Sequence, residues 1–320
     1  MYVEKLSPAY GAWKQTLIFM IHGMAQTGTN FLNKPDGTRG WASQFISQGY
    51  EIYIVDLTSR GRSASTGSQT QKVIPSEMVE MAFTATKQYM LWPQAINHTQ
   101  WPRTGVKYDP IFDAFYTSDV QFIDDAVYQQ SFVQEAGATL LDKIGKLVIL
   151  LDHSQGSYMP SFIADKRPHL TNTLVLVQLA GPAFKDEIFN LGMKNPRCWG
   201  LWDIPLTYEP PVTDPKDEII QQVHPARDNI SAQCILQSDH PEPRKLANFQ
   251  DVPILVVTRD AHFHATNDYS SVAYLRQAGC SKTEHMELGN IGIHGNGHML
   301  SMEKNSAQIQ EAIEDWLRRV

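Results

Sequence analysis

The sequence predicts an α/β protein with a mostly parallel sheet flanked by helices. Two observations predict it: short apolar runs rich in Ile, Val and Leu recur along the chain, and amphipathic stretches separate them. Parallel strands that are buried on both faces are continuously apolar, and the helices that join them are amphipathic. With 320 residues, 42% of them hydrophobic, the chain can bury a sizeable core. We therefore expect one domain over residues 1–320 with long insertions, in preference to two smaller domains.

The predicted strands and helices alternate along the chain. The strands are, in order, Leu17–Ile21, Ile52–Val55, Leu147–Leu151, Thr173–Leu179, Ile254–Thr258 and the weaker Thr283–Leu288. Helices are predicted at Trp41–Gln48, Ser131–Ile144 and Ser306–Arg319. The last helix has an apolar face at helical spacing, formed by Ile309, Ile313, Trp316 and Leu317. Alternation of this kind is typical of a sheet covered by helices on both sides.

Two long segments, at about 64–125 and 182–250, interrupt this alternation. Both are rich in aromatic residues and proline and have no strand period. Loops of this length inside a compact domain are usually lids or binding walls, so we expect the insertions to form a cap or a pocket wall. The candidate substrate-binding residues are their tryptophans, Trp92, Trp101, Trp199 and Trp202. The alternative is that the insertions face solvent and their aromatic side chains pack on the domain.

Charge and cysteine content limit the classes of partner. A net charge of −7 does not favour nucleic acid or anionic lipid, and no apolar run approaches the roughly 18 residues of a membrane helix. We expect a small-molecule substrate, no nucleic-acid partner and no membrane, and a homo-oligomer stays open. Cys198, Cys234 and Cys280 match no zinc-site spacing, so no metal and no cofactor are predicted. Free thiols, and an N-terminus unlike a signal peptide, predict a cytoplasmic location.

The clearest chemical signal is the run LVILLDHSQGSYM at 147–159, which predicts a strand, a sharp turn and the start of a helix. A serine at such a corner is held in a strained backbone conformation with its hydroxyl exposed, so Ser154 is the candidate nucleophile. Small residues two positions before and after it let strand and helix approach closely. Gly156 meets this need, whereas Asp152 stands where a glycine is usual.

A serine hydroxyl needs a base to take its proton, and in this arrangement the base follows the last strand. Two histidines lie there, in the segment IHGNGHM at 293–299. His298 is the preferred base, because the glycines around it would let its loop bend over the serine. His294 is the competitor.

A carbonyl substrate develops negative charge that needs hydrogen-bond donors. The residue after His22-Gly23, which follows the first predicted strand, and the residue after the serine are the expected backbone donors. Met24 and Gln155 are therefore the candidate oxyanion-hole residues.

An acid usually orients the histidine from the loop after the strand Ile254–Thr258. The usual spacing places that carboxylate near position 262, which is a histidine here, and Asp260 lies two residues earlier. Asp260 is thus a candidate catalytic acid, with a local cap or salt bridge as the alternative.

Several motifs together resemble one branch of the α/β-hydrolase superfamily, the atypical bacterial esterases and their fungal relatives. They are HGMAQTG at 22–28, PDGTRGWASQF at 35–45, VDLTSRGRS at 55–63, LWPQAINHTQWP at 91–102, HSQG at 153–156 and IHGNGHM at 293–299. The resemblance runs from about Leu17 to Trp316. It implies a Ser-His-acid hydrolase that acts on esters or related acyl compounds without a cofactor.

In that branch the acid is similar to a glutamate after the sixth strand, and the matching position here holds Gln178. An amide can accept a hydrogen bond from imidazole but cannot stabilise imidazolium by charge. Three functions stay open. The first is an esterase, lactonase or thioesterase; the second is a non-hydrolytic biosynthetic enzyme such as a cyclase, condensation catalyst or acyltransferase. The third is a ligand-binding protein, which leaves Ser154 and His298 without a use.

Overall fold

The computed structural model describes residues 1–65, 67, 69–179, 181–185 and 197–320. Its central sheet has seven strands in the order β1-β3-β2-β6-β7-β12-β13. Their bounds are Tyr2–Leu6 for β1, Leu17–Ile21 for β2, Ile52–Asp56 for β3, Val148–Asp152 for β6, Thr171–Leu176 for β7, Ile254–Thr258 for β12 and Thr283–Glu287 for β13. β1 runs antiparallel to β3, whereas β2 is parallel to β3 and β7 is parallel to β6 and β12. This confirms the predicted fold class.

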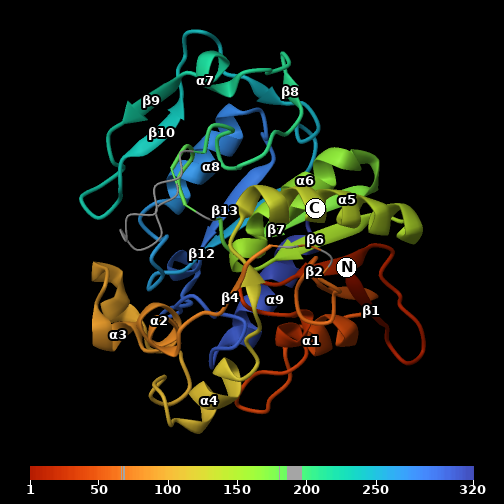
Figure 1. Cartoon of the computed structure of the whole chain (residues 1–320), viewed down its shortest axis with the longest axis vertical. Helices are drawn as coiled ribbons and strands as arrows, with labels where there is room; N and C mark the ends of the chain where they lie inside the picture. Colours follow the sequence, from red (N-terminus) through yellow and green to blue (C-terminus); the bar gives the residue numbers. More distant parts are fainter. Residues whose placement is uncertain (66, 68, 180, 186–196) are drawn as a thin grey trace. The chain divides into compact units, whose positions relative to one another are not determined.

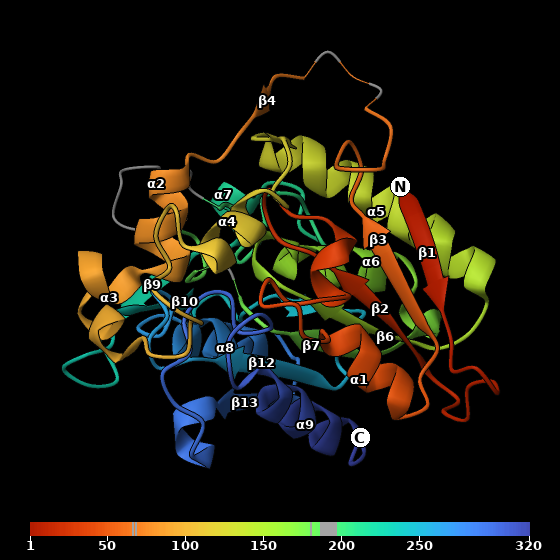
Figure 2. The ribbon, with the colours of Figure 1, turned by 90° about the horizontal axis from the view of Figure 1, so that it is seen from below.

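The chain forms two compact units. Unit 1 comprises Met1–Asp124, Arg259–Phe263 and Glu287–Val320. Besides strands of the central sheet it contains α1 (Trp41–Ser47), α2 (Ser76–Val79), α3 (Thr86–Tyr89), α4 (Pro110–Tyr116), α9 (Ser306–Leu317), β4 (Gln71–Lys72) and β5 (Phe122–Ile123). α1 packs against α9 and β3, and Figure 2 shows the two helices side by side. The predicted apolar face of α9 is confirmed, since all four of its residues are buried.

Unit 2 comprises Asp125–Thr258 and His264–Met286. Its further elements are α5 (Ala126–Ile144), α6 (Met159–Lys166), α7 (Pro215–Glu218), α8 (Asp268–Gln277), β8 (Tyr208–Glu209), β9 (Gln221–His224), β10 (Cys234–Gln237) and β11 (Lys245–Leu246). α5 packs against α6, which lies on β6 and β7, while α8 contacts β10 and β12 (Figure 1). α5 begins five residues before the predicted start, because Asp125 caps it by accepting the Tyr128 N–H.

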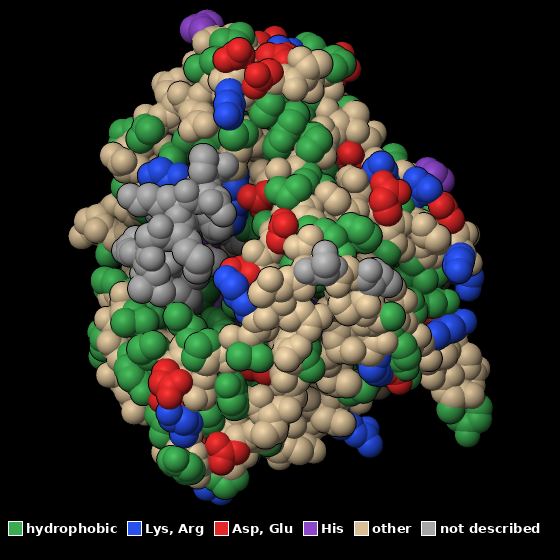
Figure 3. Space-filling model, viewed as in Figure 1, with side chains coloured by type: hydrophobic (Ala, Val, Ile, Leu, Met, Phe, Trp, Pro, Cys, Tyr) green, Lys and Arg blue, Asp and Glu red, His purple; other side chains and the backbone are tan. Residues whose placement is uncertain are grey.

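The two insertions fold into short elements within different units. The segment 64–125 supplies β4, α2, α3, α4 and β5 to unit 1, and the described part of 182–250 supplies α7 and β8 to β11 to unit 2. In the described parts of the chain, no helix combines the length and the apolarity needed to cross a bilayer. On the face drawn in Figure 3, small groups of acidic and basic side chains lie between hydrophobic and uncharged ones. Mixed charges of this kind produce only short-range fields.

Candidate active site

Ser154 lies at a sharp turn between a buried strand and a helix. His153 is extended, with φ of −147°, and Ser154 has φ of +60°, after which a 3-10 turn (Ser154–Tyr158) leads directly into α6. The left-handed conformation costs a residue other than glycine about 1–3 kcal/mol and persists only where its surroundings enforce it. The backbone therefore has the strained corner that the sequence predicts for a nucleophile.

The structure shows a use for Asp152, which stands where a glycine is usual. Its side chain is fully buried, and Oδ1 accepts a hydrogen bond of 3.1 Å from the Val177 N–H. Val177 directly follows β7, so this contact joins the end of β6 to the end of β7 within unit 2. Gln178, the next residue, is 3% exposed. The family's acid position is thus buried beside the carboxyl ends of two sheet strands.

The loop after β2, in unit 1, is held by polar contacts to the Gly23 carbonyl. The Leu57 N–H donates to His22 Nε2 at 3.0 Å, which places the ring proton on Nδ1, and Nδ1 donates to the Gly23 oxygen at 2.8 Å. Arg60 Nη1 donates to the same oxygen at 3.2 Å. Within the described parts of the chain, the Met24 N–H donates to no other group. A fixed loop with an unused amide fits the predicted role of Met24.

Burial shifts the pKa values of two charged groups behind this loop. Arg60 is 1% exposed, and burial lowers its pKa to about 10 against the opposing charges of Asp119 and Asp56. Burial also raises the pKa of the Asp119 carboxyl to about 8, although the charge of Arg60 opposes that shift. Asp119 therefore carries its proton at neutral pH.

We expect Asp119→Asn to stabilise the protein by an amount that grows as pH rises from about 4 to about 8 and is constant above that. The folded state holds the Asp119 proton up to a pH of about 8, whereas an unfolded aspartate releases it near 3.8, so stability falls as pH rises between these values. The neutral amide avoids the buried charge, and the gain at pH 9 should be about 1–3 kcal/mol, with none at pH 4. Urea denaturation at both pH values measures it. Asp251→Asn, at an almost fully exposed site, is the control, and an equal gain at both pH values would contradict the prediction.

His298 is buried between two rings of unit 1. It is 4% exposed, and the Phe83 ring stacks on it with 4.2 Å between centroids. Phe83 comes from a π-helical turn (Glu80–Thr84), a feature that is frequent at functional sites. The second ring belongs to His262, whose Nε2 lies 2.9 Å from His298 Nδ1 and which is fully buried. The two imidazoles form a hydrogen-bonded pair.

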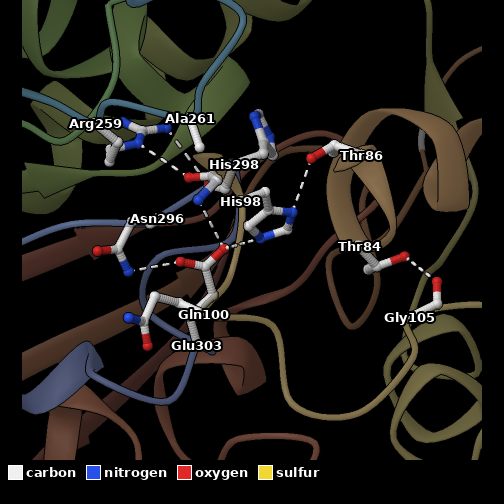
Figure 4. Close-up of polar contacts among 12 residues, drawn as sticks. Thr84, Thr86, His98, Gln100, Gly105, Arg259, Ala261, Asn296, His298 and Glu303 are labelled. Atoms are coloured by element: carbon white, nitrogen blue, oxygen red, sulfur yellow. Dashed lines mark hydrogen bonds and ion pairs between the residues drawn. The ribbon is translucent and has the colours of Figure 1, made fainter. Parts of the chain in front are cut away.

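A network of buried polar groups fixes the loop that carries His298 (Figure 4). Glu303 Oε1 accepts from the Gly297 N–H at 2.9 Å and lies 2.9 Å from His98 Nε2. Glu303 Oε2 accepts from Asn296 Nδ2 at 2.7 Å, and His98 Nδ1 lies 2.8 Å from Thr86 Oγ1. The network therefore joins the first insertion to the residues just before His298.

Two further features restrict the same loop. Arg259 Nε donates to the Gly297 carbonyl at 3.2 Å. A Cβ at position 297 would lie 2.8 Å from His98 Nε2, so only glycine fits against the buried His98 ring there.

Asp260 engages the other histidine of this loop. Its Oδ1 accepts from the Gly295 N–H at 3.0 Å, and its Oδ2 lies 3.1 Å from His294 Nδ1. The side chain of His294 is 64% exposed, in contrast to buried His298. The structure thus brings Asp260 to His294 and the loop backbone, and it brings His262 to His298. The sequence did not predict that His262 would be the partner of His298. The one indication was that His262 occupies the position where a carboxylate is expected.

The two tryptophans of the first insertion differ in burial. Trp92 is half-buried, donates to the Ala261 carbonyl at 3.0 Å and packs edge-on to Phe263. Trp92 therefore lies beside the loop that carries His262. Trp101 is 5% exposed and packs against Phe115, so it belongs to the core of the insertion.

The tryptophans of the second insertion pack within unit 2. Half-buried Trp199 stacks on Tyr208 and forms a β-bridge with Trp202. Trp202 is 2% exposed and lies edge-on to Tyr274. Trp199 thus has the more accessible ring of the two.

Comparison with known proteins found a relative in sequence and a solved structure with a similar fold. No model of a protein family matches the chain. The chain is 40% identical over 320 residues to a "probable secreted lipase phiG" of Fungal sp. (strain ATCC 74256), a match that covers 100% of this chain and 86% of the relative. Among solved structures it is similar to a novel bacterial esterase, with a TM-score of 0.61 and 20% identity over 99% of this chain and 85% of the other.

The relative corrects one expectation. A cytoplasmic location was predicted, and it is contradicted because the fungal relative is named as secreted. The prediction was wrong because it depended on the first residues and on three spaced cysteines, neither of which fixes the compartment of a folded enzyme.

The sheet order and the whole-chain match to the fungal lipase lead to the same assignment. This chain is an enzyme of the α/β-hydrolase family.

Proposed function

We propose that this protein is a serine hydrolase that cleaves an ester, lactone or thioester of a small apolar molecule. The observation that carries the proposal is Ser154, a non-glycine residue in the left-handed conformation at the end of a buried strand. The names of the fungal lipase and the bacterial esterase support the class of bond. The name of the lipase also supports a role outside the cell.

The proposed reaction has two halves. Ser154 Oγ attacks the substrate carbonyl while His298 Nε2 takes its proton, and the N–H groups of Met24 and Gln155 stabilise the oxyanion. His298 then protonates the leaving alcohol or thiol, which leaves an acyl-serine. Water attacks the acyl-serine with His298 again as base, so the acid is released and Ser154 regains its proton.

Labelling with a fluorophosphonate tests the nucleophile. We expect the parent protein to react covalently at Ser154 and Ser154→Ala not to react, because the probe requires an activated serine. Intact-mass and peptide mass spectrometry locate the label, and Ser47→Ala, at an exposed serine, is the control. A parent protein that stays unlabelled, or a label on another residue, contradicts the proposal.

A non-hydrolytic acyl transfer is the second candidate. Gln178 and His262 stand at positions where a carboxylate is expected, which favours it because a weaker base turns over an acyl-serine more slowly. A panel of p-nitrophenyl esters separates the two. Release of one free acid per nitrophenol supports hydrolysis, whereas a nitrophenol burst with an accumulating acyl-serine supports transfer to an acceptor other than water.

A further inference from the structure

We propose that His262 is the positioning residue for the catalytic base His298 and takes the place that a carboxylate has in an ordinary Ser-His-acid site. This inference rests on the proposed function. It assigns the third member of the site to a residue that neither the sequence resemblance nor the names of the relatives point to.

The geometry of the pair carries the proposal. His262 Nε2 and His298 Nδ1 are 2.9 Å apart, and both rings are nearly inaccessible to solvent. His298 uses Nδ1 for this bond, the atom through which a base is oriented when its Nε2 faces the nucleophile. His262 lies in the loop after β12, at the position where the sequence predicts an acid. Its ring is held in turn by Phe263, with 3.9 Å between centroids.

The charged groups around the pair are committed to other partners. Glu303 bonds to His98 and to the Gly297 N–H, and Asp260 bonds to His294 and to the Gly295 N–H. The guanidinium of Arg259, the nearby cation, donates to the carbonyls of residues 297 and 298. The two carboxylates therefore fix the loop, and the imidazole of His262 contacts His298 Nδ1.

A histidine in place of a carboxylate has a chemical consequence. One proton lies between His262 Nε2 and His298 Nδ1, and it can belong to either ring. When it is on His298 Nδ1, Nε2 of that ring carries no proton and acts as the base; when it is on His262, the proton of His298 is on Nε2 and that ring cannot take the serine proton. A carboxylate would enforce the first tautomer and stabilise the imidazolium, which His262 cannot do.

Substitutions at position 262 separate the effect of side-chain length from the effect of side-chain charge. In His262→Glu, Oε is as many bonds from Cα as Nε2 is in histidine, and His262→Gln has the same reach without the charge. We expect His262→Glu to raise kcat for p-nitrophenyl acetate about 10- to 10³-fold above His262→Gln, because replacing the acid by its amide cost about 10⁴ in another triad. We expect His262→Phe, which keeps a ring and loses the bond, to lower kcat more than tenfold below the parent with KM unchanged.

The pH profile gives a readout that a merely structural role would not change. The acid-side midpoint of kcat/KM should lie at higher pH in His262→Glu than in His262→Gln, because an anionic partner stabilises the imidazolium form of His298. If the glutamate variant does not fold, a comparison of His262→Gln with His262→Phe tests the inference, since only the glutamine keeps an acceptor for His298 Nδ1. His169→Glu, at an exposed histidine, is the matched control.

The outcomes distinguish this inference from the proposed function. Labelling at Ser154 together with rates for all position-262 variants within twofold of the parent overturns the inference alone. A rise in kcat in Gln178→Glu without one in His262→Glu also overturns it, because the orienting position would then be 178. An unlabelled parent protein refutes the proposed function first.

Discussion

Ser154→Ala and His298→Ala should each lower kcat for ester hydrolysis by about 10⁴- to 10⁶-fold, and the double variant should lose little more. In the proposed mechanism the nucleophile and its base act as one unit, because neither would move the proton without the other. Removing either group leaves the oxyanion donors and substrate binding, so the residual rate and KM should be similar in all three variants. Steady-state kinetics with a p-nitrophenyl ester measure the series.

Folding must be separated from chemistry in this series. Ser154→Ala keeps the volume of the turn, whereas His298→Ala removes a ring that Phe83 and His262 contact. His298→Phe keeps a flat ring between these neighbours and is the matched variant for packing. Additive losses in the double variant, or a His298→Phe variant with the parent's rate, would show that the two residues do not work together.

The fold was predictable because each buried parallel strand is a continuous apolar run in the sequence. Leu17–Ile21 and Ile254–Thr258 are continuously apolar, and their predicted and observed bounds coincide. β1 (Tyr2–Leu6) was missed because it is a half-exposed strand at the edge of the sheet, where it pairs with β3. Hydrophobic patterning reports burial on both faces, and an edge strand lacks it.

The surroundings of His298, the proposed base, were less predictable, because they depend on which side chains meet across loops. Sequence spacing identified position 262 as the expected acid position but could not tell that its imidazole would contact His298. Asp260 was the nearest carboxylate in sequence, yet the turn directs it to the Gly295 N–H and His294. Side-chain direction inside a glycine-rich loop is set by tertiary contacts, which no local pattern records.

Glu303→Ala should destabilise the protein by about 3–5 kcal/mol, because three buried polar groups would each lose their partner at about 1–3 kcal/mol. Glu303 is fully buried, and its carboxylate serves the Gly297 N–H, the Asn296 amide and the His98 ring at once. Each buried group that is left without its acceptor lowers the free energy of unfolding by its own desolvation cost. The melting temperature should fall by roughly 10 °C, since 1 kcal/mol corresponds to about 2–4 °C in large domains.

A second substitution shows whether the loss comes from this network. If His98 and Glu303 stabilise each other, His98→Ala combined with Glu303→Ala should lose less than the sum of the two single losses, with a coupling of about 1–3 kcal/mol. Thermal and urea unfolding of the four proteins measure the cycle, and Glu311→Ala, on the exposed face of α9, should change stability by less than about 0.5 kcal/mol. Strict additivity would mean that the pair is not coupled.

Because Gly297 directly precedes the proposed base, Glu303→Ala should also lower kcat at temperatures where the protein is still folded. This second readout links the buried network to His298 itself.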